Sequence, residues 1–91
     1  MWHVYILKCS DGSLYTGITT DLQKRMRKHN EGSASKYTRT RRPTALLYTE
    51  SYPLHNAAAK REIEIKSFSA QNKKKLISYG LGRRFPLGHK D

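Results

Sequence analysis

The chain has 91 residues, the size of one domain with a modest hydrophobic core. Its 18 lysines and arginines outnumber seven acidic residues, and the net charge of +11 predicts a polyanionic partner, nucleic acid before an acidic membrane surface. A single cysteine, Cys9, excludes an intramolecular disulfide and a cysteine-based metal site, and no apolar run could cross a membrane, so we expect a cytoplasmic protein.

Residues 3–18 predict a β-hairpin, because two apolar runs flank an Asp-Gly turn signal. A two-residue loop at Asp11-Gly12 would place Tyr5 and Tyr15 on opposite faces of the sheet. A three-residue loop, with Gly12 as a left-handed bulge, places both tyrosines on one face and Gly17 opposite Tyr5. We expect the three-residue loop, although the hairpin alone is also compatible with two ordinary strand aromatics.

Residues 20–32 predict a helix that begins at a capping box of Thr20 and Gln23 and ends at Asn30–Gly32. One face of this helix carries residues at the spacing i, i+3, i+4 and i+7, namely Leu22, Arg25, Met26 and His29. The two apolar residues of this face should pack on the sheet, with Arg25 and His29 at the edge of the buried seam. The remaining cations, Lys24, Arg27 and Lys28, are interpreted as solvated charge.

Residues 33–43 predict a polar loop in which cations alternate with hydroxyl groups and one aromatic ring. Such a composition favours contact with phosphate groups. The candidate nucleic-acid-binding residues of this loop are Lys36, Arg39, Arg41 and Arg42, and its aromatic residue is Tyr37. A third strand is predicted over residues 44–51, with Pro43 just before it.

A helix is predicted over residues 55–68, and its unusual residue is Glu62. Glu62 interrupts a stripe of small apolar residues, whereas Glu64 has basic neighbours within one turn and is typical of a surface ion pair. A carboxylate on a packing face either pairs with a buried cation or binds a metal ion, and these residues alone leave both interpretations open.

A final helix is predicted from a cap at Ser69 to Tyr79, ended by Gly80. Its basic run includes Lys73 and Lys74, which we expect to attract phosphate groups. The predicted domain therefore spans residues 1–80, and residues 81–91 form a basic tail that we expect to be flexible.

In chain order the prediction is an α+β fold, a small three-stranded antiparallel sheet flanked by about three helices in the order β-β-α-β-α-α. With His3-Val4-Tyr5 and Tyr15-Thr16-Gly17 on its first two strands, the chain resembles the GIY-YIG nuclease superfamily. Residues 21–30 are similar to the arginine-bearing helix of that superfamily, and residues 59–62 to its glutamate segment. The stretches 15–21 and 36–39 are similar to those of small stand-alone bacterial members.

The resemblance implies a divalent-metal-dependent endonuclease that hydrolyses phosphodiester bonds in DNA, structure-selective or non-specific. Glu62 would hold one Mg²⁺ or Mn²⁺ ion, and Arg25 would bind the scissile phosphate. Either Tyr5 or His29 would act as general base, and these residues leave that choice open. Tyr15 and Tyr37 would hydrogen-bond phosphate oxygens or the nucleophile. The expected partner is DNA, with RNA also possible, and we expect no small-molecule cofactor and a monomer or weak dimer.

Two departures from the superfamily pattern support an alternative function. His3 stands where the first motif has glycine. Many members carry an asparagine near the C-terminus, and the spacing of Asn72 from Glu62 does not identify it as the counterpart. The chain also has no room for a separate recognition domain. The alternative is therefore a nucleic-acid-binding module with weak or no catalysis that acts with a partner.

Overall fold

Three antiparallel strands form a sheet at the centre of the molecule. The computed structural model describes the backbone of residues 1–87 and the side chains of residues 1–80. Strands β1 (Trp2–Lys8), β2 (Leu14–Thr19) and β3 (Ala45–Tyr52) lie in the order β2-β1-β3, so the first strand is central. This arrangement confirms the predicted α+β fold.

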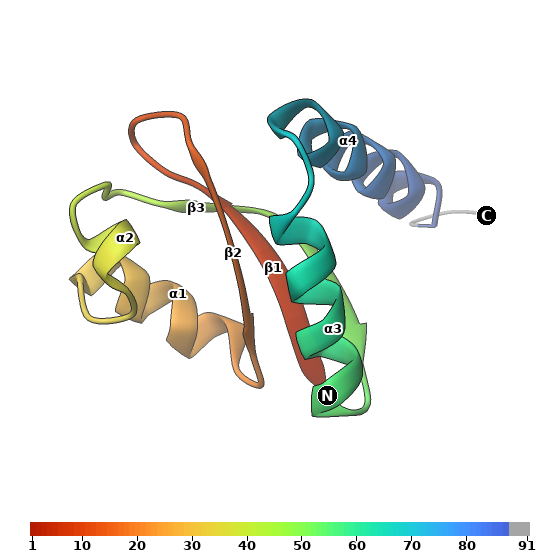
Figure 1. Cartoon of the computed structure of the whole chain (residues 1–91), viewed down its shortest axis with the longest axis horizontal. Coiled ribbons are helices and arrows are strands. Elements are labelled where there is room, and N and C mark those ends of the chain that lie inside the picture. The colour runs from red at the N-terminus through yellow and green to blue at the C-terminus, as the bar shows by residue number, and fades with distance from the viewer. Residues whose placement is uncertain (88–91) are drawn as a thin grey trace.

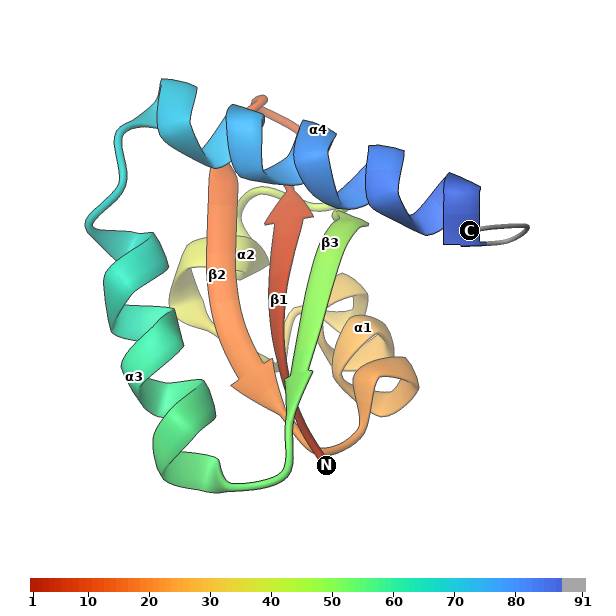
Figure 2. The same ribbon diagram turned by 90° about the vertical axis from the view of Figure 1, so that its right-hand side faces the viewer.

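Helices cover both faces of this sheet. Helices α1 (Leu22–Glu31) and α2 (Lys36–Arg39) lie on one side, and α3 (His55–Lys66) and α4 (Ala70–Leu87) lie on the other (Figure 1). Turned by 90°, the molecule shows α3 running alongside β2, while α4 crosses the end of the sheet that carries the hairpin turn (Figure 2). No helix in the part of the chain described here is long and apolar enough to span a membrane.

Strand β1 is buried on both faces, which explains its continuous apolar run. Val4, Tyr5, Ile6 and Leu7 each expose 1% of their surface or less. Because side chains alternate along a strand, Val4 and Ile6 enter the apolar core beneath α3 and α4, whereas Tyr5 points to the face covered by α1. The sheet therefore separates an apolar layer from a layer that contains polar groups.

The hairpin has the predicted three-residue loop. Cys9 N–H donates to Ser13 O at 2.9 Å, Gly12 N–H donates to Cys9 O at 3.0 Å, and Gly12 has a φ of +85°. Tyr5 consequently pairs with Gly17, and the two tyrosines share one face. The register that the turn chemistry predicted is confirmed.

Helix α1 begins one residue later than predicted. Its N-cap is Asp21, whose carboxylate accepts from Lys24 N–H at 3.0 Å, so the predicted capping box of Thr20 and Gln23 is wrong. The hydroxyl of Thr19 accepts from Asp21 N–H at 3.1 Å, which fixes the chain as it leaves β2. The helix ends at Gly32, with a φ of +87°, as predicted.

The segment predicted to be a loop contains a short helix. Ser35 caps α2, because its hydroxyl accepts from Thr38 N–H at 3.1 Å. The Ser-x-x-Thr spacing of Ser35 and Thr38 is a capping signal that was present in the sequence. The many cations around it favoured the interpretation of the segment as a loop. The helix fixes the direction of Tyr37 and Thr38.

Helix α4 does not end at Gly80 as predicted but continues to Leu87. A Cβ atom at position 80 would collide with the ring of Tyr48, so glycine serves here for close packing of α4 against β3. The division into a domain of residues 1–80 and a flexible tail stays a prediction, and residues 88–91 lie outside the described residues.

A polar cluster joins α3 to β3. Arg61 donates to Glu50 through Nε at 2.9 Å and Nη2 at 3.0 Å, and the hydroxyls of Tyr48 and Tyr52 each donate to the same carboxylate at 2.5 Å. Arg61 also forms the expected ion pair with Glu64, at 3.3 Å. Glu50 is therefore fully satisfied and anchors the helix that carries Glu62.

Candidate active site

A buried hydrogen bond joins strand β1 to helix α1. The hydroxyl of Tyr5 lies 2.8 Å from Nε2 of His29, and the two residues expose 1% and 0% of their surface. Sequence analysis placed His29 at the edge of a buried seam, but the structure buries it completely. Two of the residues predicted to carry chemistry are thus in direct contact.

His29 is held from its other side by a residue that sequence analysis did not single out. Its Nδ1 lies 2.7 Å from Oγ1 of Thr38, which in turn lies 2.9 Å from Oγ of Ser35. Among the described residues the Tyr5 hydroxyl has no other acceptor, so we assign Tyr5 O–H as donor to Nε2. His29 Nδ1–H then donates to Thr38, and Thr38 O–H donates to Ser35, which satisfies every proton.

Burial shifts the pKa values of both members of the pair toward their neutral forms. Desolvation raises the pKa of Tyr5 well above its usual value, and the charges of Tyr15 and Glu62 add to this, whereas Arg25 opposes it. Desolvation, together with the charge of Arg25, lowers the pKa of His29 to about 4. At neutral pH the pair is therefore a phenol next to a neutral imidazole.

Gly17 leaves room for this hydroxyl. A Cβ atom at position 17 would lie 2.5 Å from the Tyr5 oxygen, closer than real side chains pack. The space that a side chain at position 17 would take is thus filled by the Tyr5 hydroxyl.

Two further tyrosines extend the pair toward the surface. The Tyr15 ring packs edge-on against His29 with centroids 5.2 Å apart, and Tyr37 of α2 stacks on Tyr15 at 5.9 Å. Tyr37 is 36% exposed, so the aromatic series runs from the interior to solvent. The structure therefore brings together four predicted catalytic residues, namely Tyr5, Tyr15, His29 and Tyr37.

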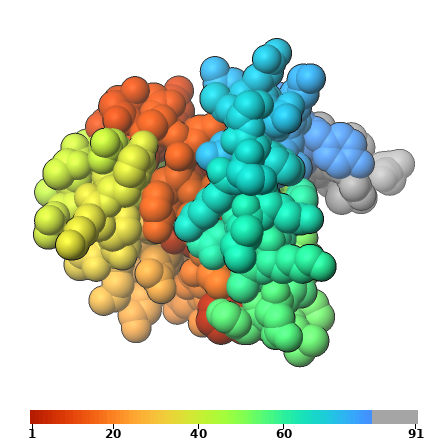
Figure 3. Space-filling view, viewed as in Figure 1, coloured from red at the N-terminus to blue at the C-terminus, as the bar shows by residue number. Residues whose placement is uncertain are grey.

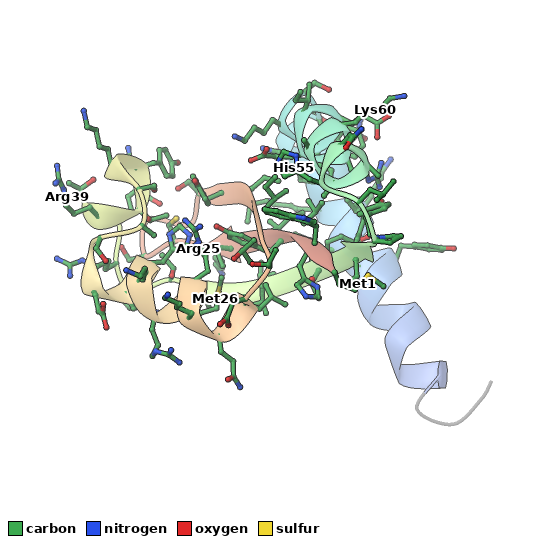
Figure 4. The ribbon with its side chains drawn as sticks, turned by 90° about the horizontal axis from the view of Figure 1, so that it is seen from below. Met1, Arg25, Met26, Arg39, His55 and Lys60 are labelled. Carbon is green, nitrogen blue, oxygen red and sulfur yellow. The ribbon has the colours of Figure 1, made fainter. Side chains whose placement is uncertain are left out.

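Arg25 lies next to this group and has no protein partner. Its guanidinium is half-buried and makes no hydrogen bond or ion pair within the described part of the chain. Figure 4 shows it between α1 and the strands. Its charge affects the pKa values of both Tyr5 and His29. A guanidinium with unused donors at this point is suited to bind an anion.

Glu62 lies on α3, which runs alongside the edge strand β2. Helix α3 lies alongside β2, and Figure 3 shows the surface hollowed between α2 and α3 with β2 as its floor. The carboxylate is close enough for its charge to raise the pKa of Tyr5. Its partner is Lys66, at 3.2 Å, whose side chain is 54% exposed, so the alternative of a buried cation is wrong.

Residues 1–75 match the GIY-YIG catalytic domain. The chain belongs to the GIY-YIG family.

Relatives of nearly the same length include a UPF0213 protein of Staphylococcus saprophyticus, 55% identical over 78 residues, which cover 86% of this chain and 95% of the relative. A UPF0213 protein of Staphylococcus epidermidis is 52% identical over 77 residues, covering 85% and 94%. Two solution NMR structures are similar, the UPF0213 protein BH0048 from Bacillus halodurans (TM-score 0.57, 45% identity) and EF2693 from E. faecalis (TM-score 0.58, 34% identity). Each comparison covers 87% of this chain and 85% of the other.

The GIY-YIG domain places the chain in a nuclease superfamily, and a nuclease domain implies a nucleic-acid substrate. The names of the relatives specify no activity, metal ion or substrate.

The basic residues predicted to bind nucleic acid do not form one surface. Lys36 and Arg39 are exposed on α2, where Arg39 projects outward (Figure 4), whereas Lys73 and Lys74 lie on α4 across the sheet. Arg42 donates to the backbone oxygens of Arg39 and Asn30, at 3.0 and 3.4 Å. The basic residues predicted on α2 and on α4 thus lie in separate regions of the GIY-YIG domain.

The guanidinium of Arg41 is engaged in contacts within the protein. Its Nε forms an ion pair with Asp11 at 3.0 Å, Nη1 donates to Tyr37 O at 3.0 Å, and the guanidinium lies 3.9 Å from the centre of the Tyr37 ring. Arg41 therefore holds Tyr37 against Tyr15, a positioning function that its basic character alone did not indicate.

Proposed function

We propose that this GIY-YIG protein is a divalent-metal-dependent endonuclease that hydrolyses phosphodiester bonds in DNA. The observation that carries this proposal is the 2.8 Å hydrogen bond between Tyr5 and a neutral His29, next to the unpartnered guanidinium of Arg25. Hydrolysis needs a proton acceptor for water and positive charge at the phosphate, and this arrangement supplies both.

His29 is the proton acceptor of the pair in this proposal. The raised pKa of Tyr5 disfavours a free phenolate, whereas the lowered pKa of His29 keeps Nε2 able to accept a proton at neutral pH. Tyr5 takes the proton of the attacking water while passing its own to His29. The hydrogen bond from Nδ1–H to Thr38 fixes the required tautomer.

Arg25 binds the scissile phosphate, because its planar donors match two phosphate oxygens and no protein group competes for them. Tyr15 and Tyr37 stand between the buried pair and solvent. In this proposal their hydroxyls contact phosphate oxygens or the nucleophile. Each of these contacts adds stabilisation where negative charge develops.

Glu62 is compatible with one Mg²⁺ or Mn²⁺ ion that takes its other ligands from water and substrate, not with a metal site built from protein ligands alone. No group of three or more His, Cys, Asp or Glu side chains that could hold a metal occurs among the described residues. Mg²⁺ in nucleic-acid enzymes commonly takes one or two carboxylates and completes its shell with water and substrate phosphate, so a single half-buried carboxylate is compatible. Such an ion would stabilise the charge of the leaving oxygen.

The test compares Glu62→Gln with Glu64→Gln, a matched removal of one carboxylate from the same helix. Labelled duplex, single-stranded and branched DNA, and RNA, are incubated with Mg²⁺, Mn²⁺ or chelator. We expect metal-dependent cleavage by wild type and Glu64→Gln, and cleavage lower by orders of magnitude for Glu62→Gln. Binding in chelator should persist for all three, because phosphate contacts come from cations.

Melting curves show whether Glu62→Gln loses cleavage only because the folded protein has become less stable. Because Lys66 is an exposed partner one turn away, losing its ion pair should cost only about 0.3–0.5 kcal/mol. A Glu62→Gln variant that is stable and cuts like wild type contradicts the catalytic role of Glu62.

A second function is favoured by one observation, the nearly complete burial of Tyr5 and His29. If no water reaches the pair, the chain is a nucleic-acid-binding module with weak or no catalysis that acts with a partner. Under that function wild type binds the nucleic-acid panel in chelator, with a strong dependence on salt, and no metal produces cleavage.

A further inference from the structure

A polar pocket lies next to Arg25 along one side of α1. Its volume is about 490 Å³, and its walls include Lys24, Arg25 and Lys28 from the helix, Thr20 just after β2, and Ser33 from the loop before α2. The three cations stand at i, i+1 and i+4, so Lys24 and Lys28 are one turn apart on the same side. The sequence alone predicts only solvated charge at these lysines.

The lysines of this pocket have no acidic partner. Every ion pair of the described residues involves Arg41, Arg61 or Lys66, and none involves Lys24 or Lys28. Two like charges at i and i+4 repel each other and destabilise a helix. This charge arrangement is therefore unfavourable for the protein alone and becomes favourable when an anion lies between the amines.

The one acid at the pocket is already engaged. Asp21 stands at the N-terminal end of α1, where Oδ1 accepts from the Lys24 amide as the helix cap. An anion would therefore lie toward the other end, between Lys28 and Ser33, away from this carboxylate.

Arg25 connects this pocket with the site around Tyr5. It lines the pocket, and its charge affects the pKa values of Tyr5 and His29. A strand whose phosphate is bound by Arg25 must continue away from the buried pair. On the pocket side of α1, Lys24 and Lys28 offer it further cations next to Arg25, and neither forms an ion pair within the described residues.

We propose that Lys24, Lys28 and Ser33 bind a second backbone phosphate, the neighbour of the phosphate that Arg25 binds on the same nucleic-acid strand. This inference rests on the proposed function, because it takes Arg25 to hold the scissile phosphate. Lysines bind phosphate as point charges and read no base, so the pocket positions the strand without selecting a sequence. It determines which linkage of a bound strand lies at Tyr5.

The test uses single-stranded thymidine trinucleotides with two charged linkages, or with either linkage replaced by a neutral methylphosphonate. Binding is followed in chelator by NMR, from the amide signals of wild type, Lys24→Gln/Lys28→Gln and a control, Lys60→Gln/Lys75→Gln. The control removes the same charge from exposed positions on α3 and α4. Figure 4 shows Lys60 on α3, far from the pocket.

Wild type and control should bind the doubly charged trinucleotide about tenfold more tightly than either singly charged one, as expected for one added charged contact. Only the doubly charged ligand should shift the amide signals of Ser33 and Ala34. In Lys24→Gln/Lys28→Gln this preference and these shifts should be lost. Equal behaviour of the two double variants, or no preference in wild type, overturns the proposal.

The readout separates this inference from the nuclease proposal. If the preference is lost only in the pocket variant while no metal supports cleavage by wild type, the phosphate site stands and the proposed activity fails. If wild type cleaves DNA but the pocket variant binds like the control, the phosphate site fails alone.

Discussion

Acid should destabilise this protein through His29. The pKa of this imidazole is 6.5 in the unfolded chain and about 4 in the folded one, because burial and Arg25 oppose its charge. Between these values the unfolded chain binds the proton and the folded chain does not, so the free energy of unfolding falls as the pH falls from about 6.5 to 4. The full shift corresponds to about 3 kcal/mol, a large fraction of the stability of a domain of this size.

The measurement is urea denaturation at intervals from pH 7.5 to 4.5, for wild type, His29→Gln and His55→Gln. His55 is exposed, so its replacement serves as the control. Wild type and His55→Gln should both lose most of the 3 kcal/mol over this range. His29→Gln should be less stable at pH 7.5 but nearly independent of pH down to 4.5. A wild-type slope that persists in His29→Gln would refute the assignment of a buried, neutral imidazole.

Four further results are expected. Gly17→Ala should lower the free energy of unfolding by about 1–3 kcal/mol in denaturant titrations, because its Cβ displaces the Tyr5 hydroxyl, and an unchanged midpoint would contradict this contact. Thr38→Val should remove the acceptor of His29 Nδ1–H and change the tautomer seen by nitrogen NMR; an unchanged spectrum would show that Thr38 does not fix it. Glu50→Gln should cost about 3 kcal/mol in thermal melts, since a half-buried guanidinium loses the nearer of its two carboxylate partners and keeps only Glu64, and a loss below 1 kcal/mol would show the cluster to be dispensable. If about five phosphates of a duplex are neutralised, log K should fall against log salt with a slope near −4.5, and a slope near zero would mean that charge does not drive binding.

Local chemistry made much of this fold predictable. The Asp-Gly turn signal limited the hairpin to two registers, and the structure has the one that gives Tyr5 and Tyr15 a common face, because side chains alternate strictly along strands. The helical spacing of Arg25 and His29 placed both on the side of α1 that meets the sheet. These predictions needed only the sterics of a few neighbouring residues.

Contacts between distant residues were not predictable. Thr38 meets His29 only because α2 folds back over α1, and no periodicity links positions 29 and 38. Glycine commonly ends a helix, so the sequence predicts a helix end at Gly80, whereas contact with the Tyr48 ring requires glycine there for packing. Arg41 was assigned to phosphate binding from its charge, before its partner Asp11 could be known.

The turn between β1 and β2 has a consequence for how the chain tolerates insertions. Exposed hairpin turns ordinarily accept extra residues with little effect. Here Ser10 N–H donates to Arg41 O at 2.9 Å, and Asp11 holds the guanidinium that covers Tyr37. Lengthening this turn would release Tyr37 from Tyr15, so among homologous chains we expect the length of the turn to vary together with the residue at position 41.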